Sequence, residues 1–253
     1  MREAAKVFIA TALTVAVLLS LWVGAISAFA LSPQMLPGPL AVGGELLRGW
    51  IGGSFWPHAA FTLQGALGGW LVGSLLGLVM GLIAVEWRPV RLTLYPIVIA
   101  IQSMPTVAVA PLIVVYFGVG LSSKLVTVGL LCFFPMFINT VAGLMSADGN
   151  LLDLYRAASA SRWRTLVDVR LPSAANHILA GLQIALVLSF IGCVVSEFVA
   201  SSAGLGYLIK TYSSELNIAV MFAGVVSLAA IGGILGYLLE LLRRHIVFWP
   251  HQS

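Results

Sequence analysis

The stretch AAFTLQGALGGWLVGSLLGLVMGLIAV, from Ala59 to Val85, contains no acidic and no basic side chain. A helix needs about 20 mostly apolar residues to cross the hydrocarbon core of a bilayer. Such a helix hydrogen-bonds its own backbone groups, so it needs no water there. The stretch is therefore predicted to be a transmembrane helix. The whole chain has the same character, because 60% of its 253 residues are hydrophobic and only 9% are charged, too few to cover a soluble core.

Five further segments resemble this one in length and hydropathy, which predicts an all-α membrane protein with six transmembrane helices. We expect one membrane domain, in which residues 1–58 form the first helix and an external segment. Residues 59–249 then form a five-helix core that includes a charged loop at residues 148–172. The predicted spans are Val7–Leu31, Ala59–Val85, Val90–Gly118, Ser122–Met145, Asn176–Ala200 and Asn217–Leu241.

Basic residues are distributed unevenly between the two sides of these spans. Lys and Arg favour the cytoplasmic side of short loops near span ends. With the N-terminus inside, only Arg48, Lys124 and Lys210 of the 13 basic residues fall outside. Both termini are therefore predicted to be cytoplasmic. The net charge of +4 reflects this asymmetry, so we expect contact with membrane lipid and no binding of nucleic acid.

The N-terminal segment allows a second interpretation. Arg2, Lys6 and Ala28-Phe29-Ala30 flank an apolar run in the manner of a cleaved signal peptide. The run from Val7 to Leu31 is longer than the 7 to about 15 apolar residues of a signal peptide, and it is long enough to span. A retained first helix is the preferred interpretation.

The second predicted span carries glycines three or four residues apart, including Gly65, Gly69, Gly73, Gly77 and Gly81. Small residues on one helical face let two backbones approach closely in lipid. We expect close helix contacts on this face, most simply within the subunit.

The third predicted span contains Pro96, Pro105 and Pro111. Each proline removes one backbone donor and frees the carbonyl four residues earlier, as at Ile101. We therefore expect an irregular helix. A freed carbonyl beside polar Gln102 and Ser103 favours a wall of the translocation pathway, although a kink that only fits neighbouring helices is an equal alternative.

The cytoplasmic segment between the fourth and fifth predicted spans is the longest and most charged loop. Its apolar residues Leu151, Leu154, Tyr155, Ala158 and Leu166 recur near helical spacing. This pattern predicts short amphipathic helices beneath the membrane, with one face available to a partner.

The order of residues in this loop resembles the "EAA" loop of ABC importer permeases. That pattern is Glu-Ala-Ala, three residues, Gly, nine residues, Ile or Val, one residue and Leu-Pro. The corresponding residues here are Asp153-Leu154-Tyr155, Ser159, Val169 and Leu171-Pro172. Further stretches look like the nitrate, sulfonate and taurine branch of these permeases, and the likeness covers about Ala59 to Trp249. They are Met104-Pro105, Ala110-Pro111-Leu112, Phe117-Gly118, Phe133-Phe134-Pro135, Glu197 and Gly204-Leu205-Gly206-Tyr207.

The loop also departs from the family pattern. Asp153 replaces Glu, Leu154-Tyr155 replaces Ala-Ala, and Ser159 replaces Gly. Serine in the left-handed backbone region would cost about 1 kcal/mol relative to glycine. We therefore predict ordinary right-handed geometry at Ser159.

The resemblance implies a type I ABC importer transmembrane fold, with a coupling helix that docks on a cytoplasmic ATP-binding subunit. We assign buried apolar area to Leu154, Ala157, Ala158 and Trp163, and orientation to Asp153, Arg156 and Arg162. For any single arginine, contact with anionic lipid is the simpler alternative. The predicted docking residues are Asp153, Leu154, Tyr155, Arg156, Ala157, Ala158, Ser159, Ala160, Arg162 and Trp163.

The resemblance also implies an assembly in the bacterial inner membrane. It comprises two ATP-binding subunits, a second copy of this chain as a homodimer, and a periplasmic or lipid-anchored substrate-binding protein. ATP and Mg would be bound by the partner subunits, and we expect no cofactor and no metal in this chain. A heterodimer remains open.

Polar residues inside the spans are candidates for the translocation pathway. Glu197 is the one acid deep enough in a span to be a candidate functional group, although pairing within the protein is the favoured alternative. Asn139 and Gln183 either line a polar route or bond between helices. The full set of pathway candidates is Gln102, Ser103, Met104, Pro105, Asn139, Gln183 and Glu197.

The sequence also argues against catalysis by this chain. It has no G-x-x-x-x-G-K-[ST] phosphate loop and no arrangement that suggests a catalytic triad. We therefore expect a transport subunit for a small solute, with a small organic anion such as a sulfonate, or a nitrate- or taurine-like solute, preferred. The alternatives are a stand-alone secondary transporter, which would need its own ion-coupling groups, and a membrane scaffold.

Overall fold

The computed structural model describes residues 2–246, and every regular element in that range is a helix. The all-α prediction is confirmed. In chain order the elements are α1 (Arg2–Ala28), α2 (Pro39–Ile51), α3 (Phe55–Glu86), α4 (Arg88–Gln102), α5 (Thr106–Phe117), α6 (Leu121–Met145), α7 (Gly149–Ala157), α8 (Arg162–Thr165), the π-helix η1 (Leu166–Arg170), α9 (Leu171–Val199), α10 (Leu205–Ser214) and α11 (Ile218–Ile246).

Four helical stretches in the described range are long and apolar enough to cross a membrane. They are Phe55–Glu86, Leu121–Met145, Arg162–Val199 and Ile218–His245. These stretches contain most of the second, fourth, fifth and sixth predicted spans. Two shorter apolar helices, Leu13–Ala28 and Ala108–Phe117, fall within the first and third predicted spans.

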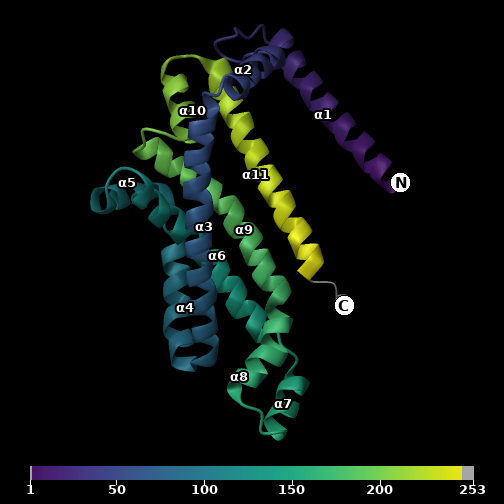
Figure 1. The fold of residues 1–253 in the computed structure, drawn as a ribbon, viewed down its shortest axis with the longest axis vertical. Coiled ribbons are helices and arrows are strands. Elements are labelled where there is room, and N and C mark those ends of the chain that lie inside the picture. The colour runs from purple at the N-terminus through teal and green to yellow at the C-terminus, as the bar shows by residue number, and fades with distance from the viewer. Residues whose placement is uncertain (1, 247–253) are drawn as a thin grey trace.

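Helices α3, α6 and α9 form the centre of the bundle, as Figure 1 shows. The contact between α3 and α6 depends on glycine. A Cβ added to Gly73 would collide with backbone atoms of Gly129, and one added to Gly77 would lie 2.6 Å from the carbonyl oxygen of Phe133. Only residues without a side chain allow the two backbones to come this close. The predicted close contact on the glycine face is confirmed.

The third predicted span is divided into two helices. α4 ends at Gln102, and Pro105 is the N-cap residue of α5. Proline has no N–H and disfavours helical geometry at the residue before it, so α4 does not continue through Met104. The predicted irregularity is confirmed. The prediction of a free carbonyl at Ile101 is wrong. The chain forms a turn here, in which the Met104 N–H donates to that carbonyl at 3.0 Å.

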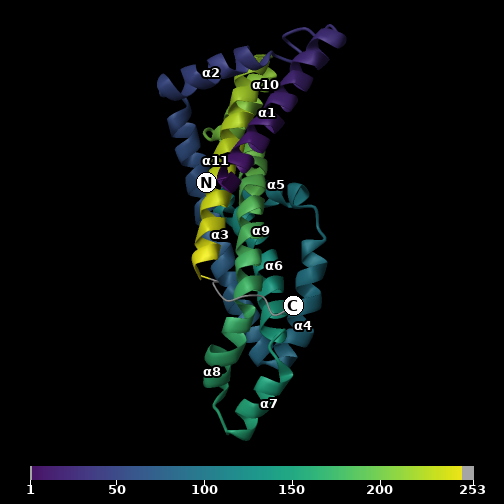
Figure 2. The same ribbon diagram turned by 90° about the vertical axis from the view of Figure 1, so that its right-hand side faces the viewer.

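The short helices gather at the two ends of the bundle. Figures 1 and 2 show α7 and α8 at one end and α2 and α10 at the other. We call the first the loop end, which comprises residues 146–170 and the end of α3. We call the second the α10 end, which comprises residues 200–217 and the start of α3. The long helices join the two ends.

Helix α1 diverges from the bundle (Figure 1). It contacts α2, and Trp22 packs on Phe222 of α11 with 5.8 Å between ring centroids. Ile9, Leu13 and Leu21 are nevertheless 65%, 64% and 64% exposed. Lipid or another chain must therefore cover most of the described part of α1.

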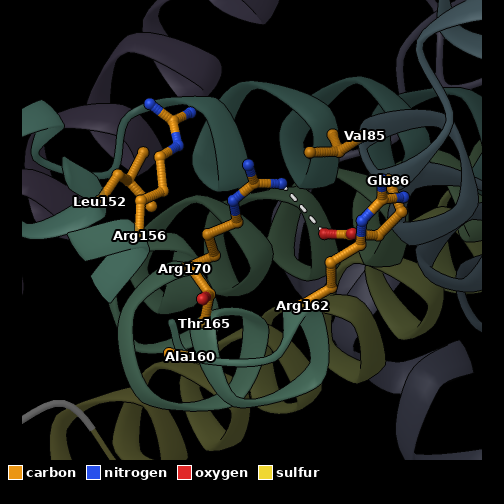
Figure 3. Close-up of a pocket in the computed structure, with 8 residues that line it drawn as sticks. All are labelled: Val85, Glu86, Leu152, Arg156, Ala160, Arg162, Thr165 and Arg170. Carbon is orange, nitrogen blue, oxygen red and sulfur yellow. Dashed lines mark hydrogen bonds and ion pairs between the residues drawn. The ribbon is translucent and has the colours of Figure 1, made fainter. Parts of the chain in front are cut away.

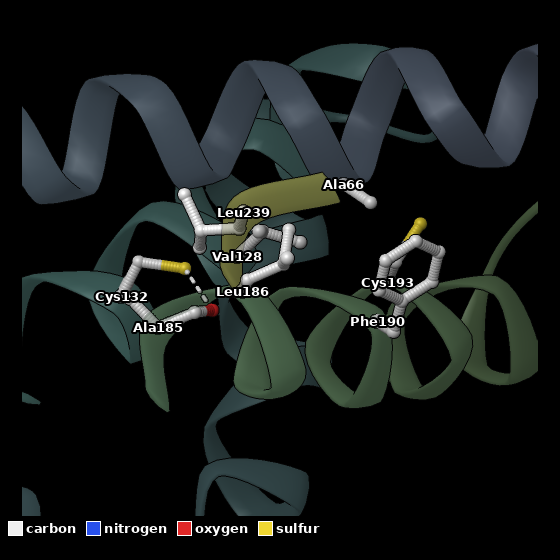
Figure 4. Close-up of a cluster of buried hydrophobic side chains, with 8 residues drawn as sticks. All are labelled: Ala66, Val128, Cys132, Ala185, Leu186, Phe190, Cys193 and Leu239. Atoms are coloured by element: carbon white, nitrogen blue, oxygen red, sulfur yellow. Dashed lines mark hydrogen bonds between the residues drawn. The ribbon is translucent and has the colours of Figure 1, made fainter. Parts of the chain in front are cut away.

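Both cysteines lie in the hydrophobic cluster at the centre of the bundle. Figure 4 shows Cys132 of α6 and Cys193 of α9 among apolar side chains that include Leu186 and Phe190. The thiol of Cys132 donates to the carbonyl oxygen of Ala185 at 3.2 Å. Both are buried free thiols, and they pack as small hydrophobic residues.

Replacing Gly73 by alanine is expected to force α3 away from α6, because the new Cβ would meet the backbone of Gly129, which cannot rotate aside. Overpacking of this kind destabilises a protein by about 1–3 kcal/mol. The thermal unfolding midpoint of the purified protein in detergent should fall accordingly. The control is Gly233→Ala in α11, where no heavy atom lies within 4 Å of the added Cβ. Equal midpoints for the two variants would contradict the close contact.

Candidate functional site

The charged loop folds into short helices with polar caps. The Asp148 carboxylate accepts a hydrogen bond from the Asn150 N–H at 2.8 Å and starts α7. The Ser161 hydroxyl accepts one from the Arg164 N–H at 3.2 Å and starts α8. Such caps satisfy backbone donors that a helix start leaves free. The prediction of short helices in this loop is confirmed.

The turn between α7 and α8 corrects the prediction for Ser159, which has a φ of 54° in the left-handed region. The N–H of Ser159 donates to the carbonyl oxygen of Arg156 at 3.0 Å, and the N–H of Ala160 donates to that of Tyr155 at 2.9 Å. These two bonds form the Schellman motif, in which the residue after the helix adopts left-handed geometry. Satisfying the last carbonyls of α7 outweighs the cost of about 1 kcal/mol for a side chain there.

The second half of the loop is anchored to the bundle. Leu166 and Val169 are 7% and 5% exposed, and Leu166 packs with Leu144 of α6 and Leu82 of α3. At this point the backbone is a π-helix, with the N–H of Leu171 bonded to the carbonyl oxygen of Leu166. Pro172 explains the irregularity, because it has no N–H for the carbonyl four residues earlier. The Val169 and Pro172 positions of the loop pattern thus seat the loop against the long helices.

The first half of the loop presents an exposed face. Leu154 and Trp163 are 61% and 72% exposed, and Ala157 and Ala158 are also exposed. Of the remaining predicted docking residues, Asp153, Arg156, Ser159 and Arg162 are exposed, and Tyr155 and Ala160 are half-buried. Asp153 and Arg156 form an exposed ion pair at 2.8 Å. Such a pair contributes at most about 1 kcal/mol, so the protein keeps these residues at its surface at little gain in stability.

The predicted pathway residues of the third span lie at the break between α4 and α5. Gln102, Ser103, Met104 and Pro105 are exposed. Gln102 and Met104 line a cavity of about 260 Å³ together with Leu131 and Phe134 of α6 and Leu188 of α9. The structure therefore brings this group together beside the central helices.

The two predicted amides lie elsewhere. The side-chain N–H of Asn139 donates to the carbonyl oxygen of Pro135, one turn earlier in α6, at 2.8 Å. Gln183 of α9 donates to the Glu240 carboxylate of α11 at 2.7 Å. Gln183 thus bonds between two helices, which is the alternative considered for isolated amides in spans, whereas Asn139 bonds within its own helix.

Glu197 is the centre of a buried polar network near the α10 end. Its carboxylate is 0% exposed and lies 2.6 Å from Nζ of Lys124, which is 1% exposed. Thr62 donates to the same carboxylate oxygen, Oε1, at 2.9 Å. The ammonium of Lys124 also lies 3.6 Å from the centroid of the Phe61 ring. The structure therefore places Glu197 in an internal ion pair between α6 and α9.

The same network holds the start of α10. The N–H of Gly206 donates to Oε2 of Glu197 at 2.6 Å, and the N–H of Leu205 donates to the Thr62 hydroxyl at 2.8 Å. Gly204 has a φ of 115°, and a Cβ there would collide with the Glu197 carboxylate. Glycine is thus required twice, for its backbone angle and for the close approach of the carboxylate.

Lys124 is the buried partner of Glu197 that the sequence analysis does not identify. The distribution of basic residues predicts an external position for it, whereas it lies three residues inside the helix that starts at Leu121. An acid deep in one span and a base at the start of another were a signal for an ion pair, because each alone is expensive to bury. Their distance in sequence, 73 residues, concealed it.

Comparisons with known proteins agree with this architecture. Residues 73–249 match the family model of the binding-protein-dependent transport system inner membrane component. The riboflavin transport system permease protein RibX of Chloroflexus aurantiacus is 34% identical over 93% of this chain and 88% of its own length. The taurine transport system permease protein TauC of Escherichia coli is 32% identical over 93% of this chain and 88% of its own length.

A similar fold occurs in a chain of the MetNI methionine ABC transporter in an inward-facing conformation. The TM-score is 0.68 at 20% identity, over 77% of this chain and 98% of that chain. This chain belongs to the family of binding-protein-dependent transport system inner membrane components. It is a multi-pass inner-membrane permease of the ABC importer class, a transport component rather than an enzyme. The family implies an ATP-binding subunit and a substrate-binding protein as partners.

Ser159→Gly is expected to stabilise the turn of the loop, because glycine adopts the left-handed geometry without a Cβ penalty of about 1 kcal/mol. Ser159→Val should have the opposite effect, since a β-branched residue fits this region worst. Hydrogen exchange of residues 154–161 in the purified protein would measure both. Slower exchange in the glycine variant and faster exchange in the valine variant are expected. The same direction for both would contradict the geometry.

Removing one charge of the Lys124–Glu197 pair is expected to lower the stability of the protein more than removing both charges. Lys124→Met leaves a buried carboxylate without its cation, at a cost of about 3–5 kcal/mol. The double variant Lys124→Met with Glu197→Gln removes both charges, so its thermal unfolding midpoint should lie above that of Lys124→Met. A double variant whose loss equals the sum of the two single losses would contradict direct coupling.

Proposed function

We propose that this chain forms the translocation pathway of an ATP-driven importer, with six transmembrane helices and both termini in the cytoplasm. The positive-inside rule supports this topology, because it places the loop end in the cytoplasm together with Arg156, Arg162, Arg164 and Arg170. The α10 end then faces the periplasm, where a substrate-binding protein delivers the solute. The relatives are ABC transporter permeases, which does not support the alternative of a stand-alone secondary transporter.

The observation that carries the proposal is the exposed surface of the short helices α7 and α8. Leu154 of α7 and Trp163 of α8 expose apolar surface, and α7 also exposes the charged groups of Asp153 and Arg156. Large apolar residues surrounded by charges are typical of a protein interface. In our proposal this face is the coupling helix, and it docks in a groove of the ATP-binding subunit.

The anchoring of the loop supports a mechanical role. Leu166 contacts α3 and α6, while Arg170 pairs with Glu86 at the end of α3 at 3.0 Å. From η1 the chain continues directly into α9. A displacement of the loop would therefore be passed to all three central helices, because packed helices move as rigid elements.

The proposed assembly contains two copies of this chain and two ATP-binding subunits, which hold ATP and Mg. The exposure of α1 supports a second copy, because this helix has little contact with its own bundle. The break at Gln102, Ser103, Met104 and Pro105 is the part of the pathway wall that we favour, since polar Gln102 there borders a cavity.

We propose a small organic anion as the solute, as for the sulfonate and taurine permeases among the relatives. Lys124 does not serve as an anion site here, because Glu197 already neutralises it. Selectivity then lies mainly with the substrate-binding protein. Measuring the uptake of taurine, aliphatic sulfonates and riboflavin into cells with and without the gene for this chain would test this class of solute. Loss of riboflavin uptake alone would contradict an anionic solute.

Asp153→Lys combined with Ala158→Glu is expected to abolish docking, because it reverses one charge and adds another on the exposed face. The ATP-binding subunit should no longer co-purify at stoichiometric amounts from native membranes, and ATP-dependent uptake should fall to background. Insertion of this chain into the membrane should be unchanged.

The matched control for this experiment is Ser214→Glu with Glu215→Lys, which makes the same two charge changes at exposed positions of the α10 end. Its ATP-binding subunit should remain bound. Normal co-purification of the ATP-binding subunit with the loop variant would overturn the proposed docking site. Uptake in the absence of any ATP-binding subunit would overturn the proposal of an ATP-driven importer.

A further inference from the structure

A second site lies at the loop end, in a cavity of about 360 Å³ between the loop and the end of α3. Three arginines line it, each from a different element: Arg156 of α7, Arg162 of α8 and Arg170 of η1. Figure 3 shows these side chains with Glu86, the one acidic residue of the lining. The cavity adjoins the proposed docking surface and shares Arg156, Ala160 and Arg162 with it, whereas the exposed apolar side chains of Leu154 and Trp163 do not line it.

The charges in this cavity are unbalanced. Glu86 pairs with Arg170 at 3.0 Å, so three guanidinium groups share one carboxylate of the lining. Arg156 has its ion pair with Asp153, which is 73% exposed and outside the lining. Among the side chains that the structure describes, Arg162 has no ion-pair partner. The lining therefore carries a surplus of positive charge that a bound anion would neutralise.

One buried donor in the wall also lacks a partner. Nε of Arg170 is buried and bonds to no group in the described part of the chain, although another nitrogen of the same guanidinium bonds to Glu86. A buried N–H without an acceptor costs about 1–3 kcal/mol. The described residues thus leave the guanidinium of Arg170, a residue of the cavity wall, incompletely satisfied.

We propose that this cavity binds a phosphate group. Guanidinium groups recognise phosphate through paired N–H donors, which makes arginine clusters typical of phosphate sites. The cavity lies at the end of α3, where Val85 and Glu86 line it and the next residue, Trp87, is exposed. Basic pockets at this level bind anionic lipid headgroups. The headgroup of an anionic phospholipid and free phosphate share the chemistry, and the experiment separates them.

Occupancy would connect the loop to the bundle, because the phosphate would contact side chains of α7, α8 and η1 at once. An effect of the ligand on coupling rests on the function proposed above. Binding itself does not, since it needs only this chain. The test therefore uses the purified full-length chain without an ATP-binding subunit.

The experiment uses delipidated protein in a neutral detergent. Three probes are added separately: phosphatidylglycerol in mixed micelles, phosphatidylcholine and inorganic phosphate. Native mass spectrometry and thermal shift measure the binding of each. We expect saturable binding of phosphatidylglycerol and none of phosphatidylcholine. Arg162→Gln removes one charged partner and should weaken binding about 10-fold, the equivalent of one charge-assisted hydrogen bond. Arg156→Gln should weaken it in the same direction and serves if Arg162→Gln does not fold.

The matched control is Arg164→Gln. Arg164 lies two residues from Arg162 on the same helix, but it pairs with Asp168 and does not line the cavity. Its affinity should equal that of the unchanged protein. Binding of inorganic phosphate without binding of phosphatidylglycerol would support the site, with free phosphate as its ligand. Failure of both probes to bind, or equal weakening by Arg164→Gln and Arg162→Gln, would overturn the proposal.

Discussion

The close approach of α3 to α6 is the constraint on which the other features of this protein depend. In a bilayer the lipid tails are as apolar as the helices, so burial of apolar surface does little to drive packing. Contact must come from backbones that approach closely, as at Gly73 and Gly77 of α3. The same glycine face makes room for the ion pair, because a Cβ on Gly65 would collide with the side chain of Lys124.

The buried pair in turn organises the α10 end. Lys124 neutralises Glu197, and Glu197 then accepts the N–H of Gly206. Thr62 of α3 binds both the carboxylate and the N–H of Leu205. Every strong acceptor and donor of this group is therefore used within the protein, which suits a rigid joint rather than a solute site. At the opposite end, Leu166 and the Arg170–Glu86 pair attach the loop to the same helices. The two ends are thus connected by one packed unit.

Much of the fold was readable from the sequence. The apolar stretches located the long helices, and the prolines at 96, 105 and 111 located the irregular third span. The spacing of the loop identified its family before any contact was known. The predictions failed where a local preference competed with hydrogen bonding in the folded chain. Ser159 takes left-handed geometry because the last carbonyls of α7 need donors, and the carbonyl of Ile101 finds a donor in a turn that proline placement alone does not specify.

The sequence by itself determined that this protein lies in a membrane and where its long apolar helices lie, because these properties reside in hydropathy. It also determined that the loop at residues 148–172 belongs to an ABC importer permease, because that property resides in local spacing. Only the tertiary structure decided that Lys124 is buried against Glu197 and that three arginines share one cavity with Glu86. The physical reason is distance. Residues far apart in the chain interact only after the helices pack, and the packing depends on side-chain shapes that no linear pattern records.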